Sequence, residues 1–337
     1  MSFPVTDKLL RELNEGEKFA GFAILRRLDM RQRKDGSPYL VLEFADRSGR
    51  IGGKVWDHVE EFRKVLSVGK IVKLMGSITT YQEQKEIHIE RLRPAVPEDA
   101  VDRFRLMPVS DRPVEEMKRH LRRLVEGITQ PQIRTFLRAF FEDATISERY
   151  FQAPAGKQWH HCYLGGLAEH SLNMAEVLLK ISESYPHANR DLLVAGALLH
   201  DIGKIEELEW KTVIDYTDRG RLLGHIVIGQ EILNAHQEKF REIPEELRLH
   251  LEHLVLSHQG TKEQGSPVEP MTLEAILLYL ADEMDSKANA FNRIIQRSRE
   301  QGDRWTEWVQ LLNRFLYAGE ALKETSQVDR PDEDTLF

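Results

Sequence analysis

The stretch LVAGALLHDIGK, residues 193–204, decides the fold class of most of this chain. Seven small or apolar residues precede His200-Asp201, and a continuous apolar run of this kind is consistent with a buried helix. Adjacent helical residues point about 100° apart, so one metal ion can be bound by both side chains only where the helix ends. Gly203 marks such an end. The stretch therefore predicts a helix that ends in two metal ligands.

Other polar residues interrupt apolar helical patterns in the same way. His170 lies in LAEHSLNM (167–174) and Asp282 in ILLYLADEM (276–284), and His225 and His258 follow the same rule. Imidazole and carboxylate groups suit divalent ions such as Mn, Fe or Zn. A single histidine on an apolar face is usually a satisfied core residue. The complete order His…His-Asp…His…His…Asp instead indicates a metal centre, in which His253 competes with His258.

Bulk properties set the class of protein. A length of 337 residues favours two domains, and 41% hydrophobic with 30% charged residues fits a soluble globular chain. Apolar runs stay well below the roughly 20 residues that span a bilayer, so no membrane contact is expected. The first residues do not have the pattern of a secretory signal. Cys162 is the only cysteine, which suits a reducing cytoplasm.

The first part of the chain has the pattern of a small β domain. Strand-like runs cover residues 19–25, 39–44, 51–56, 71–75 and 86–90, with a helical stretch at 59–66. Five short strands with one helix predict an OB-fold barrel. The prediction is thus an all-β OB-fold followed by an all-α domain. The expected boundaries are 1–93 for the OB-fold, 94–113 for a proline-rich linker, 114–325 for the helical domain and 326–337 for an acidic tail.

The helical pattern ends in two stretches, at 272–300 and 304–322. Segment 114–150 carries enough apolar surface either to pack on the helical core or to form a homo-oligomer.

Charge favours the β domain as the part that meets a polyanion. Residues 1–100 hold 18 basic and 16 acidic side chains, whereas the whole chain holds 47 and 55. Single-stranded nucleic acid is bound by cations combined with flat side chains. The candidates are Arg26, Arg27, Arg31, Arg33 and Lys34 on one hairpin, with Tyr39, Trp56 and Tyr81 for stacking. The alternative places Phe44 and Trp56 in the barrel core, and it is favoured for Phe44.

Five segments carry a family resemblance. HCYLGGLAEH (161–170), LLHDIGK (198–204), LGH (223–225), LSHQ (256–259) and LAD (280–282) resemble the HD phosphohydrolase superfamily. GSPYL (36–40) and DRSGRI (46–51) are similar to the OB part of the YhaM-type 3′–5′ exoribonucleases. The resemblance implies a helical catalytic domain that hydrolyses phosphodiester bonds of single-stranded RNA, with single-stranded DNA as a second substrate.

The resemblance also implies site residues. His170, His200, Asp201 and Asp282 match the basic ligand set, and His225 and His258 match the additional histidines of the two-metal versions. Two ions are expected, with manganese favoured and Fe, Mg, Co or Ni compatible.

Three residues, one of them also a metal ligand, receive catalytic roles. Asp201 would orient the attacking water, Lys204 would offset charge on the phosphate, and His161 would contact the phosphate or protonate the leaving oxygen. The alternatives are a solvated lysine at a helix end and a packed loop of Trp159, His160 and His161. Arg219 and Arg221 could contact substrate phosphates, although a plain exposed turn is favoured.

Two other functions compete with the exoribonuclease. The first is a phosphohydrolase of small nucleotides or cyclic dinucleotides with a regulatory OB domain, although the Gly-Tyr-Pro triplet of the cyclic-dinucleotide branch is absent. The second is a nucleic-acid-binding protein with a silent helical domain, against which the intact ligand set argues.

Overall fold

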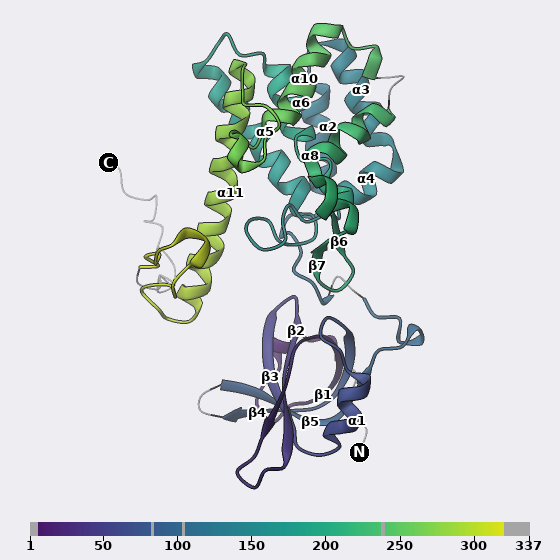
Figure 1. Cartoon of the computed structure of the whole chain (residues 1–337), viewed down its shortest axis with the longest axis vertical. Coiled ribbons are helices and arrows are strands. Elements are labelled where there is room, and N and C mark those ends of the chain that lie inside the picture. Colours follow the sequence, from purple (N-terminus) through teal and green to yellow (C-terminus); the bar gives the residue numbers. More distant parts are fainter. Residues whose placement is uncertain (1–5, 82–83, 103–104, 237–239, 320–337) are drawn as a thin grey trace, which may run out of the picture. The chain divides into compact units, whose positions relative to one another are not determined.

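The computed structural model describes residues 6–81, 84–102, 105–236 and 240–319. The chain forms two compact units, Met1–Asp282 and Glu283–Phe337. The first unit contains a closed β-barrel followed by a helical region (Figure 1). This architecture confirms the predicted fold class, an all-β OB-fold followed by an all-α domain.

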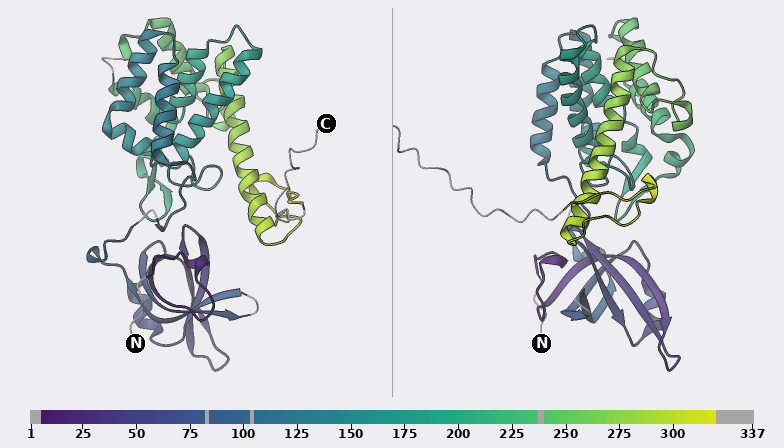
Figure 2. Two further views of the ribbon diagram at one scale, coloured as in Figure 1. Left: turned by 180° about the vertical axis from the view of Figure 1, so that it is seen from behind. Right: turned by 90° about the vertical axis from the view of Figure 1, so that its left-hand side faces the viewer.

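Five strands close the barrel in the order β1-β2-β3-β5-β4. They are β1 (Lys18–Gln32), β2 (Pro38–Asp46), β3 (Gly49–Val55), β4 (Ile71–Tyr81) and β5 (Gln84–Pro94), with α1 (Val59–Val65) between β3 and β4. Neighbouring strands are antiparallel except β3 and β5, which pair in parallel. The closed ring of strands is visible in the left view of Figure 2.

The barrel core follows from the alternation of side chains along each strand. Leu40, Leu42 and Phe44 occupy alternate positions of β2 and are at most 1% exposed. Phe44 therefore belongs to the barrel core, as favoured from the sequence, and is not available for stacking on a base.

Two strands are longer than their apolar runs. β1 continues from Leu25 to Gln32 because it pairs with β2 as far as Pro38, and a bulge at Arg26 shifts the register. β4 continues to Tyr81 because it pairs with β5. The polar ends of these strands are exposed, so hydrophobicity alone does not reveal them.

The proline-rich segment between barrel and helices is partly fixed. It contains a 3₁₀ turn at Pro97–Asp99, and Leu106 and Met107 are buried. Val109 forms a parallel bridge with Leu164, and the Ser110 N–H donates to the Leu164 carbonyl at 2.9 Å. The last part of this segment therefore braces the loop that precedes α5.

The helical region packs around one large hydrophobic core. Its elements are α2 (Val114–Glu126), α3 (Pro131–Glu142), α4 (Ala144–Tyr150), α5 (Gly166–Ser184), α6 (Arg190–Leu199), α7 (Lys204–Glu207), α8 (Asp218–Ala235), α10 (Glu245–Ser257) and α11 (Leu273–Glu300). Leu121 of α2 and Phe136 of α3 are buried in this core. Segment 114–150 thus packs on the helical core, the first of its two alternatives.

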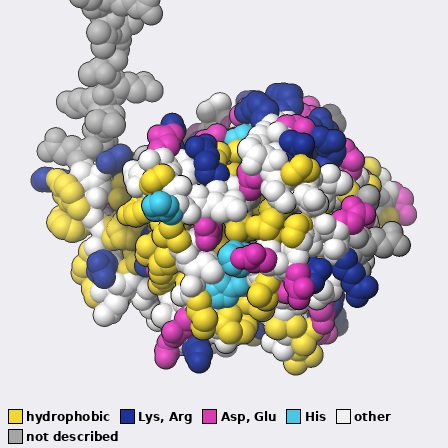
Figure 3. Space-filling view, turned by 90° about the horizontal axis from the view of Figure 1, so that it is seen from above, with side chains coloured by type: hydrophobic (Ala, Val, Ile, Leu, Met, Phe, Trp, Pro, Cys, Tyr) yellow, Lys and Arg dark blue, Asp and Glu magenta, His cyan; other side chains and the backbone are white. Residues whose placement is uncertain are grey.

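A two-stranded sheet, β6 (Leu208–Trp210) and β7 (Ile214–Tyr216), joins α7 to α8 and was not predicted. On the face shown in Figure 3, acidic and basic side chains are interspersed with hydrophobic ones. Among the helices described, none combines the length and apolar character needed to cross a membrane.

The predicted helix at 304–322 is wrong for its described part. After α11 the chain forms a short hairpin-like turn with bridges Trp305–Tyr317 and Val309–Arg314 and a 3₁₀ turn at Gln310–Leu312. Asn313 adopts a left-handed conformation with φ 51°, which interrupts any helix there. Residues 320–337, which include the predicted acidic tail, lie outside the described part.

Candidate metal centre

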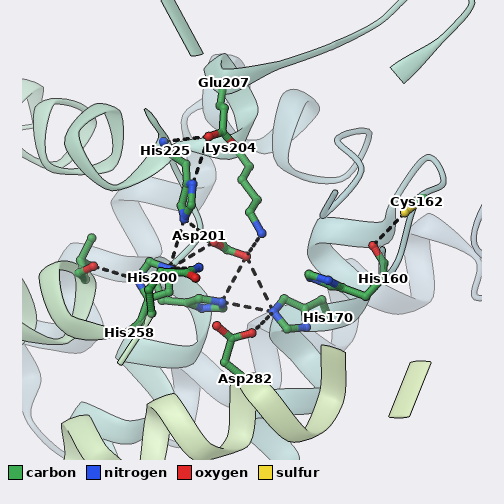
Figure 4. Close-up of polar contacts among 12 residues, drawn as sticks. His160, Cys162, His170, His200, Asp201, Lys204, Glu207, His225, His258 and Asp282 are labelled. Carbon is green, nitrogen blue, oxygen red and sulfur yellow. Dashed lines mark hydrogen bonds and ion pairs between the residues drawn. The ribbon is translucent and has the colours of Figure 1, made fainter. Parts of the chain in front are cut away.

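The predicted metal ligands converge from five separate places in the helical region (Figure 4). They are His170 on α5, His200 and Asp201 after α6, His225 on α8, His258 after α10 and Asp282 on α11. Their side chains are almost wholly buried, except for His225 at 16% exposed and Asp282 at 14%. The sequence order that suggested a metal centre is thus a cluster in space.

The end of α6 explains how two consecutive residues both face the cluster. The helix ends at Leu199, and the next residues form tight turns in which Ile202 N–H donates to Leu199 and Lys204 N–H to Asp201. Gly203 has φ −61° and ψ −20°, so it is not a left-handed cap. A Cβ on Gly203 would lie 1.9 Å from the carbonyl oxygen of His225. Glycine is needed there because α8 passes close by, which brings His225 next to Asp201.

One group of donors consists of His170, His200 and Asp201, whose ligand atoms all lie within 4.8 Å of one another. The Nε2 atoms of the two histidines are 3.2 Å apart. Asp201 Oδ2 lies 3.3 Å from His200 Nε2 and 3.7 Å from His170 Nε2. Asp282 approaches from α11, with Oδ1 3.3 Å from His170 Nε2.

A second group consists of Asp201, His225 and His258, also within 4.8 Å. Asp201 Oδ1 lies 3.5 Å from the Nε2 atom of each histidine and has no hydrogen-bond partner within the described residues. Asp201 therefore offers one carboxylate oxygen to each group. This geometry suits a carboxylate shared between two cation positions.

Hydrogen bonds on the far side of two rings test whether a cation fits the second group. His258 Nδ1 lies 2.8 Å from the Val255 carbonyl oxygen, which can only accept, so Nδ1 carries the proton. His225 Nδ1 lies 3.1 Å from Glu207 Oε1 and donates in the same way. In the neutral rings both Nε2 lone pairs then face each other at 3.3 Å. A metal ion bound by both nitrogens would remove this repulsion, so the donor set fits a metal.

The electrostatics favour the protonation states that a metal requires. Burial alone would raise the pKa of Asp201, but the Lys204 ammonium and neighbouring imidazoles outweigh it and hold this pKa well below its usual value. Burial would also raise the pKa of Asp282, but the hydrogen bond from His170 outweighs this effect and lowers this pKa. Burial lowers the pKa of His258. Ionised carboxylates and neutral imidazole are the forms that bind divalent ions.

Lys204 lies inside the site rather than at a solvated helix end. Its side chain is buried, and Nζ donates to Asp201 Oδ2 at 2.5 Å. Burial alone would lower the pKa of Lys204, but Asp201 and Asp282 outweigh it and raise this pKa, so the ammonium stays charged. Lys204 therefore places a permanent positive charge beside the shared carboxylate.

Glu207 contacts the metal centre through His225, and no pattern in the sequence predicts this contact. It is buried, and Oε1 accepts from both the backbone N–H of His225 at 3.0 Å and Nδ1 of the same ring. Its neighbour Glu206 instead points outward and pairs with Arg219. The sequence Glu206-Glu207 contains no signal that separates the two.

We expect Glu207→Gln to lower metal affinity and hydrolysis about 10- to 100-fold, the range found when the partner of a ligating histidine is lost. The amide oxygen of glutamine can accept the same hydrogen bond. Without the negative charge of the carboxylate, however, it does not strengthen the binding of a metal ion by the His225 ring. Metal titration by calorimetry measures the change. Glu206→Gln is the matched control and should behave as wild type. Equal affinity in both variants would contradict this role of Glu207.

The structure places the other two candidate histidines, His161 and His253, in different surroundings. His161 is buried, its ring centroid is 5.4 Å from that of His170, and Nδ1 is 2.8 Å from the Tyr163 hydroxyl. His253 Nε2 accepts from the Met271 N–H at 2.9 Å. The structure therefore brings His258, not His253, to Asp201.

The predicted nucleic-acid-binding residues of the barrel partly form a cluster. The rings of Tyr39 and Trp56 stack with centroids 4.7 Å apart, and the Arg33 guanidinium lies 4.8 Å above the Trp56 ring. Trp56 is 47% exposed, so it does not fill the core. A half-exposed indole beside a cation offers a surface on which a base can stack.

The other members of that set are more dispersed. Arg27 pairs with Asp29, Arg31 and Lys34 are exposed, and Arg26 is half-buried at the bulge. The side chain of Tyr81 lies outside the described residues.

Arg219 and Arg221 are both engaged with carboxylates. Arg219 pairs with Glu206 and Glu231, and Arg221 pairs with Asp215. Both residues lie at the start of α8 and not in a plain turn, so the turn favoured from the sequence is wrong, although both side chains are exposed.

Comparison with protein families finds two matches. The HD domain model matches residues 167–287, and a model described as an OB-fold nucleic acid binding domain matches residues 24–95. The first match contains all six residues of the metal centre. The second covers most of the barrel.

Curated relatives match over most of their length. A protein named 3′-5′ exoribonuclease YhaM from Oceanobacillus iheyensis is 34% identical over 84% of this chain and 88% of its own. One of the same name from Geobacillus sp. is 32% identical over 90% and 92%. Among solved structures, a domain of replication protein A from Methanococcus maripaludis covers 26% of this chain and 92% of its own, at 18% identity and a TM-score of 0.23.

Proposed function

The chain belongs to the YhaM family of 3′–5′ exoribonucleases, and from that premise we propose that it shortens single-stranded RNA from the 3′ end by metal-dependent hydrolysis. The proposal includes single-stranded DNA as a second substrate and the cytoplasm as the place of action. Hydrolysis of small nucleotides or cyclic dinucleotides is not favoured, because the relatives are named as exoribonucleases.

The observation that carries the proposal is the shared carboxylate. Asp201 directs one oxygen toward each of two histidine pairs, an arrangement suited to a pair of cations. We propose that one ion is held by His170, His200, Asp201 and Asp282 and a second by Asp201, His225 and His258. Nitrogen and oxygen donors without a thiolate favour manganese, and Fe, Mg, Co and Ni are compatible.

Divalent metal bound there would supply Lewis-acid stabilisation of negative charge on the phosphate. The remaining roles belong to the protein. The ionised Asp201 carboxylate orients the attacking water by accepting a hydrogen bond from it. The Lys204 ammonium, which is buried and charged, offsets the negative charge that develops on the phosphoryl oxygens. His161 would contact the phosphate or protonate the leaving oxygen.

Hydrolysis of an RNA labelled at its 5′ end tests the proposed function. With Mn²⁺ or Mg²⁺ we expect a ladder that shortens stepwise from the 3′ end, because the label stays on the shrinking strand. Chelator should abolish the ladder and added metal should restore it. An internal cut, or an intact RNA in the presence of the metal-loaded protein, would contradict the proposal. A parallel reaction with single-stranded DNA tests the second substrate.

We propose that the barrel holds the RNA strand through the cations of its β1–β2 hairpin and the Tyr39–Trp56 stack. The charge reversal Arg31→Glu with Arg33→Glu should weaken RNA affinity about tenfold or more at low salt, because counterion release scales with the cations that meet phosphates. Fluorescence anisotropy with a labelled oligonucleotide in chelator measures binding without cleavage.

The matched control for this charge reversal carries the same change in net charge elsewhere. Arg122→Glu with Lys180→Glu reverses two exposed cations on α2 and α5. If both double variants lose affinity equally, general electrostatics rather than the barrel hairpin holds the RNA.

A further inference from the structure

His160 lies in the loop between α4 and α5, and this loop is tightly fixed. Ala155 N–H donates to the His161 carbonyl at 3.1 Å, and the Cys162 thiol donates to the His160 carbonyl at 3.3 Å. His161 has φ 43°, a left-handed conformation that is unfavourable for a residue with a side chain. A Cβ on Gly166 would lie 2.1 Å from the His161 carbonyl, so the loop is pressed against α5. The backbone that carries His160 is therefore held in place by the surrounding structure.

The ring of His160 faces the metal centre without belonging to it. In Figure 4 it points from the loop toward His170 and the Asp201–Lys204 pair, on the side opposite His258. Its centroid lies 5.2 Å from that of His170, and the two rings are tilted by 55°. No group of described residues that could hold a metal ion includes His160. The ring thus stands next to the place where a substrate phosphate would meet the cations.

Both ring nitrogens of His160 are shielded from solvent and lack a hydrogen-bond partner within the described part of the chain. Most buried polar atoms in folded proteins have such a partner, and an exception at a site calls for a functional explanation. An apolar side chain of similar size would fill this space without that loss. His161 differs, because its Nδ1 already contacts Tyr163.

We propose that His160 is a substrate ligand whose ring N–H donates a hydrogen bond to an oxygen of the scissile phosphodiester. This inference rests on the proposed function, because it takes the phosphodiester as the substrate. A phosphodiester oxygen only accepts hydrogen bonds, and a neutral imidazole always offers one donor. The other ring nitrogen is then an acceptor, which suits a hydroxyl group of the sugar or a water molecule.

Full-length His160→Ala tests the proposal. We expect kcat/KM on RNA to fall about 10- to 100-fold, because a hydrogen bond to a charged group is lost. His160→Gln keeps an N–H donor on a side chain of similar reach and should recover part of the activity. His187→Ala, the same change at an exposed position after α5, should match wild type. Equal activity of His160→Ala and His187→Ala would overturn the proposal.

Two measurements without turnover separate a substrate ligand from other roles. Metal content, measured by atomic emission, should be unchanged in His160→Ala, and a loss of metal would instead make His160 a metal ligand. The melting temperature should stay level or rise, because an unpartnered polar ring has been removed. A fall of several degrees would assign the ring a structural role and overturn the proposal.

Sulfur substitution at the phosphate identifies the contact. RNA with a single Rp or Sp phosphorothioate at the last linkage offers a weaker acceptor at one non-bridging oxygen. One diastereomer should slow wild type more than it slows His160→Ala, because both changes remove the same hydrogen bond. Equal slowing of both proteins by both diastereomers would overturn the contact with a non-bridging oxygen.

Bis(p-nitrophenyl) phosphate keeps the inference independent of the RNA assay. It is a phosphodiester without a nucleotide. If wild type cleaves this compound but not RNA, the proposed function fails, and the effect of His160→Ala on the compound still tests the contact.

Discussion

Asp201→Asn should lower RNA hydrolysis by at least about 10³-fold while the chain still folds. Loss of an outer partner of a ligating histidine typically costs 10- to 100-fold, and Asp201 is a direct donor to both groups, so its loss must exceed that range. The Asp201 carboxylate directs Oδ2 toward His170 and His200, and Oδ1 toward His225 and His258. Asparagine has only one oxygen, and that oxygen carries no negative charge. Single-turnover kinetics and metal content by atomic emission measure the two consequences.

A second buried carboxylate provides the control. Asp191 accepts hydrogen bonds from Thr129 and Gln130 at the start of α6 and lies outside the metal centre. Asp191→Asn should lower the melting temperature yet keep metal content and kcat, whereas Asp201→Asn should lose both. If Asp201→Asn retains wild-type metal content and activity within tenfold, Asp201 is not the shared ligand.

Several of the side chains that the structure brings together at the centre could be predicted from the sequence. Each ligand interrupts an apolar helical pattern, and burial of that face forces the polar group into the interior, where it must find a partner. His170, His200 and Asp282 obey this rule and lie within one cluster. The choice between His253 and His258 could not be made in this way, because both lie on α10 or directly after it and only the direction of the ring distinguishes them.

Glu207 and His160 lay beyond reach for a different reason. Their positions depend on how neighbouring elements fold back on one another, namely α7 on α8 for Glu207 and the loop before α5 on the centre for His160. No periodicity or spacing records such a contact. The hydrogen-bond partners on the far side of each histidine, which fix the ring nitrogen that faces the metal, are equally invisible in the sequence.

The wrong helix at 304–322 shows how periodicity can mislead. Trp305, Trp308 and Phe315 recur at intervals close to those of a helical face. In the structure Trp305 packs on Tyr317 and Trp308 on Phe315, with ring centroids 5.0 Å apart in each pair. These are contacts across a turn. Aromatic pairs of this kind stabilise a hairpin as readily as a helix, so spacing alone could not decide.

Gly203→Ala should both destabilise the protein and disable the site, although alanine adds a single methyl group. The added Cβ would lie 1.9 Å from the His225 carbonyl oxygen and 2.7 Å from the Gly229 nitrogen. Both are backbone atoms, so no side chain can move aside, and α8 must shift away from the turn that carries Asp201. Overpacking of a core typically costs 1–3 kcal/mol, and we expect about 3 kcal/mol here because the backbone must move. Denaturant titration measures this loss.

The same shift should reduce activity independently of unfolding. A displacement of about 1 Å in a catalytic group can lower the rate about 10²-fold, and α8 carries His225. Activity measured well below the melting temperature should therefore fall by about that factor, together with the affinity for metal.

Gly127→Ala is the matched control for Gly203→Ala. It makes the same change after α2, where the new Cβ would lie 3.4 Å from the nearest carbonyl oxygens. It should change stability by less than about 1 kcal/mol and leave activity intact, because no backbone segment has to move. If Gly203→Ala behaves like Gly127→Ala, α8 does not approach the turn as closely as described. Gly203 would then be explained by the helix end, as the sequence alone suggests, and not by the proximity of His225 to Asp201.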